Sequence, residues 1–137
     1  MILLDTNICI GILHANPKVL GHVQAASEAI GVPAMVEGEL YYGVEKSDFR
    51  EENLVATNKL LKSLVVYHTT DEIMRKFGDL KASLECHGRR IDDADVLIAA
   101  TALTASPLRL LSMERACACS WLTASMVTRS ARITTIK

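Results

Sequence analysis

The sequence lacks any apolar run that approaches the roughly 18 residues needed to cross a bilayer, which excludes a protein that spans the membrane. No basic region precedes the opening residues 2–5 and no cleavage site follows them, so we expect a cytoplasmic protein. Cysteine is scarce and irregularly placed. Cys9, Cys86, Cys117 and Cys119 match neither the spacing of zinc ligands nor a disulfide framework, and we expect reduced thiols.

The sequence also lacks a strong excess of either charge. Its net charge of −1 gives no sign of the basic surplus that is typical of general nucleic-acid binders. The acids are nevertheless concentrated in residues 1–103, which hold fifteen acids and ten bases, whereas residues 104–137 hold one acid and five bases. The four histidines lack the i,i+4 spacing of a metal-binding helix, so we assign none of them to catalysis.

What the sequence does contain is typical of one globular domain over residues 1–137, with 50% apolar and 23% charged side chains. Short apolar runs alternate with stretches of helical periodicity. We expect strands at 2–4, 30–33, 64–67, 108–111 and 133–136, and helices that begin at Pro17 or cover 36–46, 51–64, 71–87 and 92–103. This alternation predicts an α/β fold with a mainly parallel central sheet.

Three carboxylates stand out in this arrangement. Asp5 ends a hydrophobic strand, Glu39 lies within the helix 36–46, and Asp95 enters a helix that is apolar nearly all round. Ligands of open α/β sheets collect at the carboxyl ends of the strands, where these side chains could converge. Crowded carboxylates raise one another's pKa unless a cation lies between them, and Mg²⁺ or Mn²⁺ suits an all-oxygen site. Such an ion can activate water against a phosphodiester.

Each of these acids also has a purely structural interpretation. Asp5 could cap a turn, and Glu39 could be a solvated helix residue. Asp92 and Asp93 suit helix caps better than metal ligands, and Asp95 could be a first-turn acid that the helix dipole favours.

Three blocks of sequence favour the functional interpretation of these acids over the structural one. The stretches Leu3–Asn7, Gly38–Ser47 and Ile91–Leu103 resemble, in order and separation, PIN-domain toxins of the VapC type. The resemblance covers residues 1–112. It implies a three-layer α/β/α fold, Mg²⁺- or Mn²⁺-dependent ribonuclease activity on RNA, a homodimer, and neutralisation by a small antitoxin protein.

The resemblance also assigns residues. It makes Asp5, Glu39 and Asp95 the catalytic, metal-coordinating acids. Gly43 lies four residues after Glu39 on the same helix face, where the missing side chain would let another backbone come close.

The match fails after the fourth predicted strand. Similar toxins supply a further polar or acidic group there, and this chain offers Ser112 and Glu114, of which Glu114 is the candidate fourth metal ligand. Residues 113–137 do not resemble the usual ending of the family. An alternative function is therefore a catalytically impaired PIN-like module that mainly binds an antitoxin and dimerises. A phosphotransfer domain ranks last, because the Asp-x-Asp spacing of the haloacid-dehalogenase type is missing.

Five basic residues on and after the helix 71–87 have two interpretations. They could line a path for the RNA backbone, or they could belong to solvated helix faces, which is the commoner role of such charges. These residues are Arg75, Lys76, Lys81, Arg89 and Arg90.

Overall fold

The computed structural model describes residues 2–104, 109–113 and 132–136 of the chain. Its strands are β1 (Ile2–Leu4), β2 (Ile30–Pro33), β3 (Val65–Tyr67), β4 (Arg109–Met113) and β5 (Arg132–Ile136). Its helices are α1 (Thr6–Leu13), α2 (Pro17–Gln24), α3 (Ala34–Glu45), α4 (Arg50–Lys62), α5 (Asp71–Cys86) and α6 (Asp93–Thr104).

The strands form one parallel sheet in the order β3-β2-β1-β4-β5. The chain builds outward from β1 to β3 on one side and then crosses to β4 and β5 on the other, so the order reverses between β1 and β4. Such a switch point opens a crevice at the carboxyl ends of the two strands. The α/β class and the parallel sheet predicted from the sequence are confirmed.

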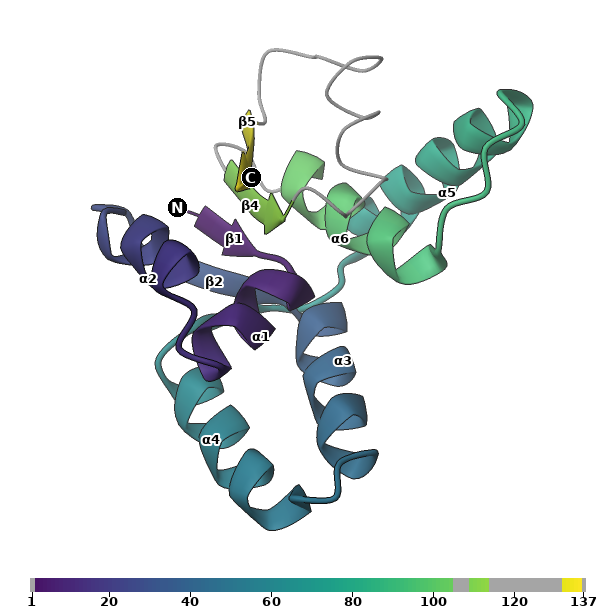
Figure 1. Cartoon of the computed structure of the whole chain (residues 1–137). Helices are drawn as coiled ribbons and strands as arrows, with labels where there is room; N and C mark the ends of the chain where they lie inside the picture. Colours follow the sequence, from purple (N-terminus) through teal and green to yellow (C-terminus); the bar gives the residue numbers. More distant parts are fainter. Residues whose placement is uncertain (1, 105–108, 114–131, 137) are drawn as a thin grey trace.

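The helices pack against the sheet and one another (Figure 1). The main core joins β1, β2 and β4 to α1, α3 and α6, and a second cluster joins α5 to α6. Figure 1 shows α3 and α4 extending together away from the sheet. Helix α6 is buried along most of its length, as its apolar sequence predicts. In the described part of the chain, no helix is both long enough and apolar enough to cross a membrane.

One helix was not predicted from the sequence. Residues after Asp5 suggested a turn, yet α1 begins at Thr6 and ends at Leu13. Three isoleucines and a glycine give this segment a weak intrinsic preference for helix. Tertiary packing determines the conformation instead, because Ile8 and Cys9 are buried in the main core and Gly11 is buried against Val19 of α2.

The turn after α5 has a defined geometry. Gly88 has a φ of +67°, a left-handed conformation that glycine adopts without strain. Its N–H donates to the carbonyl of Glu85 at 2.9 Å, and the N–H of Arg89 donates to the carbonyl of Leu84 at 3.0 Å. These two bonds make a Schellman motif, and they fix the direction in which the chain leaves α5. Gly88 therefore ends α5.

Replacing this glycine should therefore destabilise the fold. Gly88→Ala should lower the free energy of unfolding by about 1 kcal/mol, because an L side chain strains the left-handed backbone. The cost is conformational, since an added Cβ would meet no atom of the described residues within 4 Å. Gly78→Ala is the matched control, because Gly78 lies inside α5 with equally open surroundings and should gain about 0.5–1 kcal/mol. Urea unfolding of both variants measures the difference, and equal shifts would contradict this account.

Candidate functional site

Asp5 stands at the point where β1 ends and α1 begins. Its side chain is only 5% exposed, and its Oδ1 accepts a hydrogen bond from the Ile8 N–H at 2.8 Å as the N-cap of α1. Its backbone N–H donates to the carbonyl of Leu111 in β4 at 3.1 Å. Asp5 thus has a buried carboxylate at the switch point between β1 and β4, and it caps α1.

Glu39 reaches the same region from α3. The hydroxyl of Thr6, the residue after Asp5, donates a hydrogen bond to Oε2 of Glu39. Glu39 is half-buried, and its neighbours on α3 include the buried Val36 and Leu40. The solvated-helix interpretation of Glu39 is therefore wrong, because its carboxylate is oriented by a specific contact with α1.

Asp95 lies in the first turn of α6 and is half-buried. Burial raises the pKa of its carboxyl above the ordinary value, and the negative charges of Glu39 and Asp92 raise this pKa further. The influence of Glu39 places the two carboxylates in one electrostatic environment. A carboxyl group with these neighbours is one that a bound cation would stabilise in its ionised form.

Asp92 and Asp93 make structural contacts, and the capping role predicted for either of them is found for Asp92. Asp92 accepts a hydrogen bond from the Ala94 N–H at 2.9 Å through its side chain, and its carbonyl accepts one from the Val96 N–H at 3.1 Å. Asp93 forms an ion pair with Lys81 of α5 at 2.8 Å. Asp92 therefore caps α6, and Asp93 ties α6 to α5.

Asp5, Glu39 and Asp95 come from α1, α3 and α6, which meet beside the carboxyl ends of β1 and β4. These carboxylates do not form a complete set of metal ligands. Among the described residues, no group of three or more His, Cys, Asp or Glu side chains is arranged to hold a metal ion. Carboxylate oxygens of buried and half-buried acids still have the chemistry that Mg²⁺ or Mn²⁺ requires. Glu114, the predicted fourth ligand, lies outside the described residues.

Cys9 lies one turn after Asp5 and is fully buried. Burial raises the pKa of its thiol to about 12, and the charge of Asp5 adds to the effect. A thiol with this pKa stays protonated at neutral pH and is a poor nucleophile. This environment supports the assignment of the chemistry to carboxylates and not to cysteine.

A cavity of about 240 Å³ opens beside Glu39, between α1, α3 and α4. Its walls include Ile10, Leu40 and Val44. Gly43 also lines it, and an added Cβ there would meet no atom within 4 Å. Among the described residues, no backbone makes the close approach that was predicted for Gly43, because the glycine faces the cavity.

The link between Thr6 and Glu39 was missed from the sequence. It joins residues 33 positions apart, and no local pattern marks such a contact. The one local signal that could have suggested it is the polar Thr6 directly after Asp5.

Comparison with known proteins gives consistent matches. The PIN domain family matches residues 2–107. Ribonuclease VapC2 of Haemophilus influenzae is 33% identical over 101 residues, which cover 73% of this chain and 76% of the relative. Ribonuclease VapC19 of Mycobacterium tuberculosis is 34% identical over 106 residues, which cover 75% of this chain and 81% of the relative.

Solved structures match over almost the whole chain. VapBC2 from Rickettsia felis, bound to a DNA fragment from its promoter, has a TM-score of 0.81 at 24% identity and covers 100% of both chains. VapBC-1 from nontypeable Haemophilus influenzae has a TM-score of 0.81 at 22% identity, and the match covers 98% of each chain. VapBC-5 from Mycobacterium tuberculosis, a member of a family of toxin-antitoxin systems, has a TM-score of 0.70 at 20% identity over 98% of this chain and 97% of that one. At these identities the likeness shows the fold.

Proposed function

Because the chain belongs to the PIN-domain family, among the VapC ribonucleases, we propose that it is a metal-dependent endoribonuclease and the toxin of a toxin–antitoxin pair. The observation that carries this proposal is the position of Asp5, Glu39 and Asp95 at the switch point of the sheet. Two of these carboxylates interact electrostatically, and the third is buried at a strand end. The names of the relatives indicate the reaction class, which is RNA cleavage. The three acids are the groups that would hold the ion for this reaction.

The three acids would hold Mg²⁺ or Mn²⁺. When bound, the ion supplies Lewis-acid stabilisation of the charge that develops on the phosphodiester and lowers the pKa of a bound water. Asp5 is fixed by its hydrogen bond to Ile8, and Glu39 is oriented by Thr6. These two contacts keep the donors close to their working positions, which limits the reorganisation that substrate binding requires.

The test of this function is cleavage of RNA by the purified protein. With Mg²⁺ or Mn²⁺, a labelled oligoribonucleotide should be cut internally, and excess EDTA should reduce the cleavage to background. Adding back the ion should restore cleavage, which excludes damage to the protein as the cause. The DNA strand of the same sequence is the matched control. Equal cleavage with and without EDTA would contradict the role of the ion.

We further propose three associations: an RNA substrate, a small antitoxin protein and a second copy of this chain in a homodimer. The VapBC structures support the antitoxin, because they are named as toxin–antitoxin assemblies. The apolar cavity that borders Glu39 offers contact area for a protein partner next to the acids. The free thiols of Cys9 and Cys86 fit the reducing cytoplasm in which such a pair would act.

The alternative is a catalytically impaired module that binds an antitoxin and dimerises. It would keep the fold and the cavity beside Glu39, but its acids would hold no ion. Binding of a divalent ion therefore separates the two functions.

A further inference from the structure

A second cavity lies at the far end of α5, where the chain turns into α6. Its volume is about 570 Å³, and its floor includes the buried Leu84 and Val96. Lys81, Arg89 and Arg90 also line it, together with Glu85 and Asp93. Three basic and two acidic side chains thus surround an apolar floor. None of them belongs to the acid site, by which we mean Asp5, Glu39 and Asp95.

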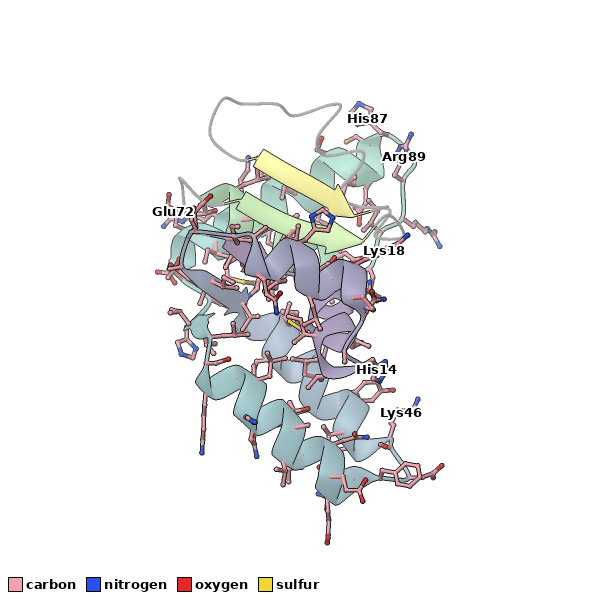
Figure 2. The ribbon with its side chains drawn as sticks, turned by 60° about the vertical axis from the view of Figure 1, so that its left-hand side comes forward. His14, Lys18, Lys46, Glu72, His87 and Arg89 are labelled. Carbon is pink, nitrogen blue, oxygen red and sulfur yellow. The ribbon has the colours of Figure 1, made fainter. Side chains whose placement is uncertain are left out.

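The basic side chains of this cavity differ in their place on the chain. Lys81 belongs to α5 and forms a 2.8 Å ion pair with Asp93, and the hydrogen bond in this pair raises the pKa of Lys81. Arg89 and Arg90 are exposed and follow directly after Gly88, whose turn fixes the direction of the chain. Figure 2 shows Arg89 beside His87 at one end of the molecule, far from Lys46 at the end of α3. The two guanidinium groups therefore stand on an anchored turn.

The cavity and the acid site share the first turn of α6. Asp93 faces α5 through Lys81, whereas Asp95 lies near Glu39 of α3. Residues two positions apart in the sequence are separated by about 200° around a helix axis. The side chains of Asp93 and Asp95 therefore lie on nearly opposite sides of α6. A helix with its side chains is about 10–12 Å wide, which a strand of a few nucleotides can span.

We propose that Arg89 and Arg90 form a subsite for the phosphate backbone of single-stranded RNA, on the side of α6 away from Asp95. The inference rests on the proposed ribonuclease function and deepens it. Guanidinium groups bind phosphate oxygens through paired hydrogen bonds, and they also stack on exposed bases. A polyanion that extends from the acids around the start of α6 would meet these arginines next.

The test uses RNA binding in the presence of EDTA, so that it does not depend on cleavage. Arg89→Gln/Arg90→Gln should weaken the binding of a fluorescein-labelled oligoribonucleotide about tenfold in anisotropy titrations. It should also reduce the slope of log K against log salt by about 1.4, the value for two phosphate contacts on a single strand. Arg89→Lys/Arg90→Lys should recover most of the salt slope, because the charges remain.

The matched control is Lys59→Gln/Lys62→Gln, which removes the same charge from exposed positions on α4. In cleavage assays, the arginine variant should raise KM about tenfold with little change in kcat, and the lysine control should change neither. Binding by the arginine variant equal to that of the control would overturn the subsite. So would a wild type that binds no RNA, or an arginine variant that loses only antitoxin binding. If the wild type binds RNA with these properties but cuts none, the ribonuclease function fails and the subsite stands.

Discussion

Asp5→Asn should lower the rate of RNA cleavage by about a hundredfold or more while the fold stays intact. If Asp5 helps to hold the proposed ion, its loss removes part of a stabilisation worth several kcal/mol in the transition state, and each 1.4 kcal/mol is about tenfold in rate. The fold should survive because the oxygen of an asparagine side chain can still accept the Ile8 N–H bond that caps α1. Single-turnover cleavage and circular dichroism measure the two effects.

Two further variants separate capping from catalysis. Asp5→Ala should lose the activity and also about 1 kcal/mol of stability, since it has no capping oxygen. Asp48→Asn makes the same chemical change at an exposed position between α3 and α4, and it should leave cleavage unchanged. If Asp5→Asn cleaves RNA as fast as the wild type, Asp5 has only the structural role.

The sheet could be predicted from the sequence because its strands are short apolar runs with no competing periodicity. The first of them, Ile2–Leu4, is buried on both faces and ends at a polar residue. Helix α6 was equally clear, because a continuous run of small and apolar residues follows an acidic start. Helix α1 could not be predicted, because eight residues with low helix preference leave the decision to tertiary contacts.

The acid site was only partly predictable. Asp5 was predicted from its position at the end of a strand, whereas Glu39 and Asp95 stood out as acids of predicted helices, and the resemblance supported all three. The contact between Thr6 and Glu39 depends on how α3 packs against α1, which neither segment specifies alone. Gly43 was misjudged for the same reason, because its helical spacing from Glu39 does not reveal that a cavity lies beside it.

In the metal-free protein, neighbouring carboxylates should repel one another and lower the stability of the fold. An ion bound between them should therefore stabilise the protein. Burial and the charges of Glu39 and Asp92 raise the pKa of Asp95, so ionising this group costs free energy in the folded state. A raised folded-state pKa means that the folded protein binds the proton more tightly than the unfolded chain. The stability of the metal-free protein should therefore fall as the pH rises from the ordinary pKa of an aspartate through the raised one.

Mg²⁺ or Mn²⁺ should reverse this loss. An ion that binds only the folded state stabilises it by about 2.7 kcal/mol at a hundredfold excess over Kd, which corresponds to roughly 5–10 °C in Tm for a domain of this size. The shift should be large near neutral pH and should shrink as the pH falls through the raised pKa of Asp95, because protons then compete with the ion. Thermal melts with and without the ion, at several pH values, measure it.

The same melts on Asp5→Asn and Asp95→Asn decide where the ion binds. Each variant removes one charge from the cluster, so each should be more stable than the wild type without metal at neutral pH and should respond much less to Mg²⁺ or Mn²⁺. Asp48→Asn should melt like the wild type under both conditions. A metal-induced shift that is equal in all four proteins would place the ion away from these acids. A wild type that shows no shift would favour the impaired module, because its folded state would then gain nothing from the ion.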